Sequence, residues 1–297
     1  MAGRFRFGLL YTGGTLEEWR ETARKAEDLG FSTLVAQEHF GAQLSPLHSL
    51  VAAAAVTTRL RFGTIVLDND FRHPAVLAKE AATVDVLTGG RFELGLGAGW
   101  LASDYEATGI AFEAAPVRIQ RLKEAVQICR SFFAGESVTF HGRHYNVTGL
   151  EAFPRPVQQR LPVLIGGRQR RMLSYAAGEA DIVSISMLDP RPKDGPPPPG
   201  FAEKAAWVRE AAARPVEIHA NGFAAEVTDD AAGALQRIAD RIGATPQQAL
   251  ENPANLVGSV DSIVEQLQGW QERCGLGYIS LQPRVMAAFA PVIARLT

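Results

Sequence analysis

The sequence predicts an α/β fold, a (β/α)8 TIM barrel with insertions, on three observations. Eight short apolar runs alternate with amphipathic helical segments, as expected of successive βαβ units. Eight such units need about 250 residues, and the chain has 297. Its 46% hydrophobic and 21% charged residues exclude disordered, collagen-like and coiled-coil proteins. We therefore expect a single domain over residues 1–297, with an open doubly wound sheet as the alternative.

The expected strands and helices follow one another in regular order. The strands are Phe5–Tyr11, Thr33–Gln37, Leu60–Leu67, Arg91–Gly95, Pro162–Ile165, Ile182–Ile185, Val216–Phe223 and Tyr278–Leu281. The helices with the clearest pattern are Thr15–Leu29, Leu47–Thr57, Pro74–Leu87 and Pro116–Phe133. Thr15 and Glu18 form a capping-box pattern, and Pro74 stands at a first turn, where a missing N–H does no harm.

Two segments do not fit the alternation and are expected to be insertions. The first is a hairpin near 135–160, centred on Ser137–Val147, with turn residues Gly142 and Asn146. The second is the proline-rich run Pro190–Gly200 near 188–200, which cannot form the interior of a helix or strand. This loop follows a late strand, so it would lie at the mouth of the barrel, either as a lid or as an unstructured surface loop.

Charge and cysteine content limit the partners and the compartment. The net charge of −2 gives no basic face for nucleic acid. Two distant cysteines, Cys129 and Cys274, favour a reducing compartment, and no apolar run reaches the length of a membrane helix. We therefore expect a cytoplasmic protein without a membrane or nucleic-acid partner. No metal-binding motif is present, and no metal is expected.

Two glycine-rich strand ends are candidates for ligand binding. Gly95–Trp100 (GLGAGW) resembles a dinucleotide motif, but its sixth position is tryptophan and it lies mid-chain. Its glycines either allow a planar ligand to approach the backbone or merely turn a strand into a helix. The second, Gly166-Gly167, is followed by Arg168, and this combination favours a phosphate site at a helix N-terminus over a plain turn.

Glu38-His39 follows the second strand, where the mouth of a barrel would be. Histidine can donate or accept a proton near neutral pH, and an adjacent carboxylate could tune it. Arg72 and His73, just before Pro74, are interpreted as helix-entry residues.

Taken in order, these pieces resemble the luciferase-like monooxygenase superfamily, and within it the deazaflavin-dependent oxidoreductases. The resemblance covers about two thirds of the chain. It is carried by Phe7–Leu9, Ala26–Phe31, Glu38-His39, Gly63–Val66, Arg72–Ala75, Leu87–Arg91, Leu94–Trp100, Phe112, Arg118, Arg121–Glu124, Phe140–Gly142, Tyr145, Pro154–Val157, Pro162–Gly167 and Ala180-Asp181.

The resemblance implies an isoalloxazine-type cofactor at the C-terminal mouth of the barrel. It places a non-prolyl cis peptide in a bulge at Ile65–Val66, the cofactor phosphate on Gly166-Gly167, and the ring edge along Gly97–Trp100. The cofactor-binding residues expected on this basis are Thr64, Ile65, Val66, Gly97, Ala98, Gly99, Trp100, Ile165, Gly166, Gly167 and Arg168, with Ser184 and Ser186 as weaker candidates.

The resemblance also implies a function. The pattern favours coenzyme F420 over flavin mononucleotide (FMN), with hydride transfer to a small organic molecule, reducing a C=C or C=N bond. His39 would handle the proton and Glu38, in place of the aspartate of the sugar-phosphate and alcohol dehydrogenases, would tune it. Trp100 stands near the position of a second catalytic carboxylate in the sugar-phosphate enzymes, which suggests an apolar substrate. An FMN-dependent monooxygenase and a non-catalytic ligand-binding barrel are the alternatives. A homodimer packed through early helices is expected.

Overall fold

The computed structural model describes residues 4–188 and 198–297. The chain divides into two compact units. Unit 1 contains residues 1–11, 25–34 and 167–297, and unit 2 contains residues 12–24 and 35–166. The prediction of one domain stays a prediction. The proline-rich loop expected near 188–200 falls mostly on residues 189–197, outside the described residues.

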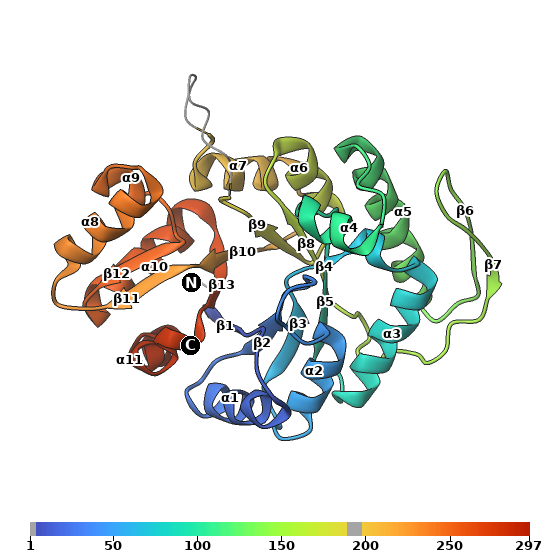
Figure 1. The fold of residues 1–297 in the computed structure, drawn as a ribbon, viewed down its shortest axis with the longest axis horizontal. Helices are drawn as coiled ribbons and strands as arrows, with labels where there is room; N and C mark the ends of the chain where they lie inside the picture. The colour runs from blue at the N-terminus through green and yellow to red at the C-terminus, as the bar shows by residue number, and fades with distance from the viewer. Residues whose placement is uncertain (1–3, 189–197) are drawn as a thin grey trace. The chain divides into compact units, whose positions relative to one another are not determined.

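Unit 2 holds most of the elements of the first half of the chain (Figure 1). Its own elements are α2 (Pro46–Ala54), β3 (Arg61–Thr64), β4 (Leu67–Asp68), the short 3-10 helix η1 (Asn69–Phe71), α3 (Pro74–Leu87), β5 (Phe92–Gly97), α4 (Ala102–Thr108), α5 (Ala115–Phe133), β6 (Val138–His141) and β7 (Asn146–Leu150). Three further elements have residues in both units: α1 (Leu16–Asp28), β2 (Thr33–Ala36) and β8 (Val163–Gly167).

Unit 1 holds the first strand and the second half of the chain. Its elements are β1 (Arg6–Leu10), α6 (Arg170–Glu179), β9 (Ile182–Ile185), α7 (Phe201–Ala211), β10 (Glu217–Gly222), β11 (Ala224–Val227), α8 (Ala231–Ile242), α9 (Pro246–Leu250), β12 (Asn255–Gly258), α10 (Val260–Cys274), β13 (Leu276–Leu281), the 3-10 helix η2 (Pro283–Val285) and α11 (Met286–Leu296).

Parallel strands form the core of both units. In unit 2, β5 is wholly buried and pairs in parallel with β3, β4 and β8. In unit 1, β13 pairs in parallel with β1 and β10, and β10 pairs with β9. Strands buried in this way read as continuous apolar runs, which is why they could be located in the sequence.

All eight predicted strands are confirmed, and the third contains an interruption. β3 ends at Thr64 and β4 begins at Leu67, and the peptide bond between Ile65 and Val66 is cis. This is the place that the family resemblance assigns to such a bond. The four predicted helices are confirmed within a few residues, and the Thr15–Glu18 capping box is formed by reciprocal hydrogen bonds.

The hairpin insertion is confirmed as the antiparallel pair β6–β7, which lies beside α5 (Figure 1). A second insertion, residues 224–258, was not predicted. There β11 and β12 pair in parallel, and α8 and α9 cover them around a small core of its own, made of Ala224, Ala234, Ile238, Ala239, Ala249 and Val257. Among the described helices, none has the length and apolar character needed to span a membrane.

Candidate active site

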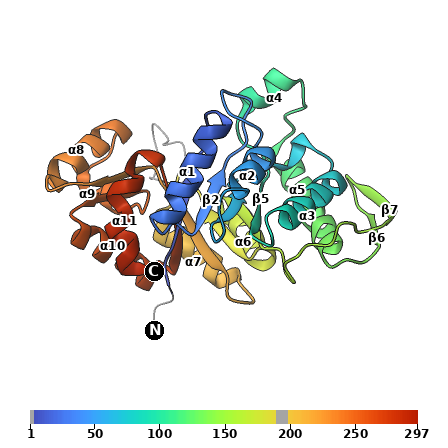
Figure 2. The same cartoon turned by 90° about the horizontal axis from the view of Figure 1, so that it is seen from below.

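His39 is held by a carboxylate that the sequence did not reveal. It follows β2, and its Nδ1 lies 2.6 Å from Oδ2 of Asp104 in α4, while Oδ1 of Asp104 accepts a hydrogen bond from the backbone N–H of Phe40. Asp104 is buried, whereas His39 remains partly exposed. Figure 2 shows α4 standing beyond the ends of α2 and α5. A carboxylate at Nδ1 fixes the ring and its tautomer and leaves Nε2 to exchange a proton.

The structure gives Glu38 partners other than His39, and its expected role in tuning His39 stays a prediction. The Glu38 carboxylate forms a two-pronged ion pair with Arg72, with Nη1 3.1 Å from Oε2 and Nη2 donating to Oε1. Its Oε2 also accepts the backbone N–H of Asp68 at 3.0 Å. Glu38 and His39, which both follow the end of β2, therefore contact different partners. Arg72 is therefore more than a helix-entry residue, whereas His73 does cap α3 through the N–H of Ala75.

A second buried carboxylate lies close by. Asp68, at the end of β4, accepts hydrogen bonds from the Tyr105 hydroxyl on both oxygens, at 2.9 and 2.8 Å. Burial raises the pKa of Asp68 to about 6, against the lowering effect of the hydrogen bonds from the Asp70 backbone and Tyr105. Burial also raises the pKa of Tyr105, helped by the Asp68 charge. Two adjacent residues of α4 thus bond to groups at strand ends: Asp104 to His39, and Tyr105 to Asp68.

Glycines surround the interruption of the third strand and let the Val66 side chain pack closely against the neighbouring strands. A Cβ on Gly97 would lie 2.6 Å from Cγ2 of Val66, and one on Gly166 would lie 3.3 Å from its Cγ1. The Val66 side chain therefore packs against bare backbone at the ends of β5 and β8. The N–H of Ile65 donates to the Ala36 carbonyl at 2.7 Å, so the end of β2, which precedes His39, adjoins the interruption. Val66 and these glycines, which we call the glycine-lined ridge, lie where the family resemblance places the cofactor ring.

The other predicted cofactor residues of unit 2 differ in what they can offer. Thr64 is buried, and its hydroxyl exchanges hydrogen bonds with the backbone of Gly95, so its side chain ties β3 to β5. Arg118 fixes the following loop by donating to the carbonyls of Ala98 and Gly99. Trp100 follows them and is exposed.

The predicted phosphate site begins at the end of β8. The Ile165 side chain is fully buried, so only its backbone is available, whereas Gly166, Gly167 and Arg168 are partly exposed. The Gly167 carbonyl accepts the N–H of Ser186. Arg168 donates from Nη1 to the Leu188 carbonyl at 3.1 Å, so part of its guanidinium is already bound within the protein.

Ser184 belongs to a buried network in unit 1. Its hydroxyl lies 2.9 Å from Nδ1 of His219, and Nε2 of His219 lies 2.9 Å from the hydroxyl of Ser280. Burial, and secondarily the Arg6 charge, lower the pKa of His219 to about 3, so this histidine is neutral. Among the described residues, no three His, Cys, Asp or Glu side chains are grouped as metal ligands would be.

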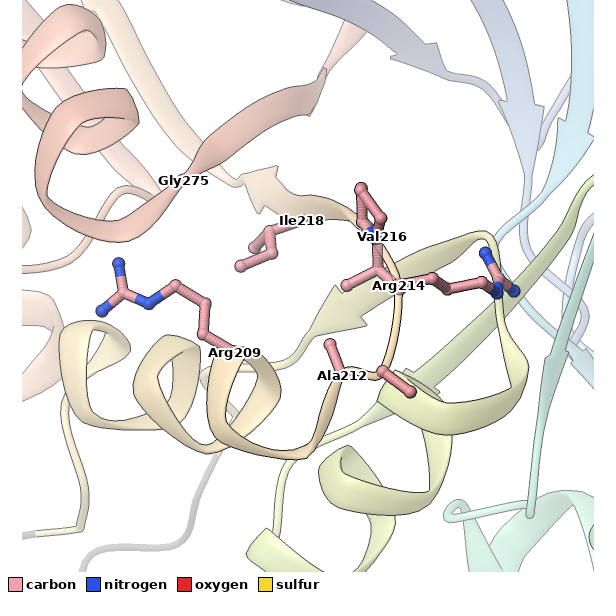
Figure 3. A pocket seen from close by; sticks show the side chains of 8 residues that line it. Arg209, Ala212, Arg214, Val216, Ile218 and Gly275 are labelled. Atoms are coloured by element: carbon pink, nitrogen blue, oxygen red, sulfur yellow. The ribbon is translucent and has the colours of Figure 1, made fainter.

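A surface pocket of about 440 Å³ lies at the amino ends of strands β10 and β13 in unit 1. It is lined by Arg209, Ala212–Val216, Ile218 and Gly275, near the starts of β10 and β13 (Figure 3). Arg209 donates to the Arg273 carbonyl, and Arg214 donates to the Ala180 carbonyl and pairs with Asp181. Active sites of β/α barrels lie at the carboxyl ends of the strands, so this pocket is not the candidate active site.

The parallel β/α fold and the motifs at its strand ends define a class of protein. Residues 3–255 match the luciferase-like monooxygenase family, and the chain belongs to that family. The chain is 38% identical, over 149 residues, to an F420-dependent glucose-6-phosphate dehydrogenase from Microbacterium testaceum. That match covers 48% of this chain and 44% of the relative, so the chain spans about half the length of the curated relatives it matches.

Solved structures show the same fold. The F420-dependent tetrahydromethanopterin reductase from Methanopyrus kandleri superposes with a TM-score of 0.79 at 17% identity, covering 99% of this chain and 100% of that one. A riboflavin lyase solved with modified FMN gives a TM-score of 0.79 at 15% identity, covering 99% and 91%. The predicted (β/α)8 TIM-barrel fold is confirmed.

Proposed function

We propose that the protein is an oxidoreductase that uses coenzyme F420 to transfer a hydride to a small organic substrate, reducing a C=C or C=N bond. The pairing of His39 with the buried Asp104 beside the glycine-lined ridge is the observation that carries this proposal. Membership of the luciferase-like family supports it. The similarity to F420-dependent glucose-6-phosphate dehydrogenases supports the choice of cofactor.

The chain's own residues would hold the cofactor and manage the proton. Coenzyme F420, when bound, supplies the hydride. His39 would give a proton from Nε2 while Asp104 stabilises the charged ring through Nδ1. Glu38 keeps Arg72 and the Asp68 backbone in place. The residues that would contact the cofactor are Ile65, Val66, Gly97, Ala98, Gly99, Trp100, Ile165, Gly166, Gly167 and Arg168, with Thr64 acting through its backbone.

The alternative is an FMN-dependent monooxygenase, because the riboflavin lyase of the same fold was solved with modified FMN bound. Titration of the purified protein with each cofactor separates the two, with absorbance and cofactor fluorescence as readouts. We expect uptake of F420 with a dissociation constant at least tenfold lower than that of FMN. Uptake of FMN alone would overturn the choice of cofactor, and uptake of neither would favour a non-catalytic ligand-binding barrel.

His39→Ala tests the catalytic assignment. We expect loss of turnover with F420 affinity within about twofold of the wild type, because His39 would act on the substrate proton. General acid–base catalysis typically contributes about 10²–10⁴-fold to rate. His48→Ala is the matched control, since His48 is exposed and contacts Ser45 instead. Full activity of His39→Ala would rule out the role.

We also propose that the protein is a cytoplasmic homodimer that takes a small-molecule substrate. The alanine-rich α2, with partly exposed Val51 and Ala52, could allow close helix approach. Light scattering during gel filtration tests the proposal: a mass of about twice 32.0 kDa supports it, and a mass of one chain contradicts it.

A further inference from the structure

We propose that the substrate taken up beside His39 is an uncharged, planar molecule with an apolar face, such as a cyclic enone, and not a phosphorylated sugar. This inference rests on the proposed function and concerns the substrate class of the same site. Aromatic side chains and the charge balance around His39 carry it.

Four aromatic residues of unit 2, which we call the aromatic rim, come from η1 and from loops near His39. They are Phe40, Phe71, Trp100 and Phe112. Phe40, next to His39, and Trp100, itself a candidate site residue, are each 56% exposed. The Trp100 ring stands perpendicular to the His39 ring with 5.8 Å between centroids. Exposed apolar groups gathered at one place commonly mark a ligand site.

Phe40, Phe71 and Phe112 pack on the buried Tyr105, directly or through one another, so this part of the rim is held in place before a ligand arrives. Phe40 packs on Phe71 with 5.0 Å between ring centroids, and Phe71 packs on the buried Tyr105 at 5.3 Å. Phe112 lies 4.6 Å from Tyr105 on centroids and is covered by the Arg118 guanidinium. Rings held in this way lose little conformational freedom on binding and favour flat, apolar surfaces.

The charges next to the rim disfavour an anionic substrate. Arg72 is paired with Glu38, Arg121 with Asp70, and Arg118 is bound to backbone carbonyls. The carboxylates of Asp68 and Asp104 lie in the same cluster of unit 2. A phosphate dianion approaching these residues would therefore meet arginines that are already paired, and it would be repelled by the carboxylates. A neutral molecule would meet no such repulsion.

An enone matches the proton donor as well as the rim. In its reduction the C=C π bond breaks and two C–H bonds form. The β-carbon receives the hydride, which carries two electrons from the reduced F420 named in the proposed function. The α-carbon receives the proton from Nε2 of His39, which regains a proton from water. The carbonyl group of an enone polarises the double bond for this addition, and its flat ring can lie against Trp100 and Phe40.

Binding of 2-cyclohexenone and of glucose 6-phosphate to the F420-loaded protein, measured by calorimetry, tests the inference. We expect the enone to bind at least tenfold more tightly than the sugar phosphate, and Phe40→Ala to weaken enone binding about tenfold. Phe153→Ala, at an exposed phenylalanine between β7 and β8, is the matched control and should bind the enone as the wild type does. Trp100→Phe, which keeps an aromatic face, should lose less than Phe40→Ala.

Tighter binding of glucose 6-phosphate, or enone binding unaltered in Phe40→Ala, would overturn the inference. F420 affinity, followed separately by cofactor fluorescence, distinguishes this failure from failure of the proposed function. Protein that binds F420 but prefers the sugar phosphate contradicts the substrate class alone. Protein that binds no F420 contradicts the proposed function itself.

Discussion

At the residue scale, the pairing of His39 with Asp104 decides which nitrogen can act. Asp104 accepts from Nδ1 and from the Phe40 backbone, so the ring is fixed from one side and Nε2 is left for the substrate. The sequence could place Glu38 and His39 at a strand end, but not this partner. Asp104 lies 65 residues away in a seven-residue helix whose N-cap, Leu101, makes no side-chain cap hydrogen bond.

Asp104→Asn should lower turnover about 10–100-fold with F420 affinity unchanged, the range typical of partners that orient a functional histidine. The amide cannot stabilise a charged imidazole ring, although it keeps the shape of the carboxylate. Steady-state kinetics across pH 5–9 measures the effect, and we expect an altered pH profile in addition to the lower rate. Asp229→Asn, at an exposed aspartate, is the control. An unaltered rate and profile would show that Asp104 only supports the fold.

Asp68 makes stability depend on pH, because burial raises its pKa from the ordinary value of 3.8 to about 6. Below pH 3.8 the carboxyl is protonated in both folded and unfolded chains. As pH rises from about 4 to 6 the unfolded chain loses this proton first, so the folded state loses stability, by at most about 3 kcal/mol. Asp68→Asn should abolish this loss. Urea unfolding at pH 4, 5, 6 and 7 measures it, and parallel curves for the two proteins would contradict the assignment.

At the element scale, the regular part of the chain was predictable and the insertions less so. Buried parallel strands and helices such as α3, with proline at its first turn, carry strong local signals. The segment 224–258 does not, because its strands have four residues each and its core is mostly alanine. The helix α4 was not predicted for a similar reason. Its polar sequence has no apolar period, and its burial comes from contacts with distant residues such as Asp68.

A buried carboxylate of α5 bonds the turn of the hairpin β6–β7. Glu124 accepts hydrogen bonds from the backbone N–H groups of Arg143, His144 and Tyr145, which form the turn. Burial opposes ionisation of Glu124, but these hydrogen bonds outweigh it and lower its pKa. The turn is therefore held by a charge that is present at neutral pH.

Glu124→Gln should destabilise the protein by about 1–3 kcal/mol at pH 7, because an amide NH₂ would face backbone donors. A lowered pKa stabilises the fold above the pKa of the unfolded chain, and this contribution disappears as pH falls through the lowered value. The difference between variant and wild type should therefore shrink in acid. Urea unfolding and proteolysis of residues 135–160 measure it, with Glu136→Gln, at an exposed neighbour, as the control. A difference that persists at low pH would contradict the role of the charge.

At the scale of the whole molecule, unit 1 contains a buried group, His219, whose effect on stability changes with pH in the opposite direction to that of Asp68. His219 is fully buried between Ser184 and Ser280, and its pKa falls from the ordinary value of 6.5 to about 3. Below pH 6.5 His219 binds a proton in the unfolded chain, whereas in the folded chain it stays neutral until about pH 3. Stability therefore falls as pH decreases from about 6.5 to 3, by at most about 5 kcal/mol. The two groups have opposite effects in the window where they overlap, between about pH 4 and 6.

This opposition tests whether the two units unfold together, as a single domain requires. If they do, calorimetry of the wild type shows one transition. In Asp68→Asn its midpoint should rise with pH between 4 and 6, because the effect of His219 is no longer opposed by Asp68. In His219→Asn the rise due to His219 is lost, so the midpoint should increase less with pH than in Asp68→Asn, or fall. Among the described residues, Asp68 bonds to Tyr105 whereas His219 bonds to Ser184 and Ser280, so the two effects should add. Two transitions, each sensitive to only one of the substitutions, would instead show that the chain folds as two domains.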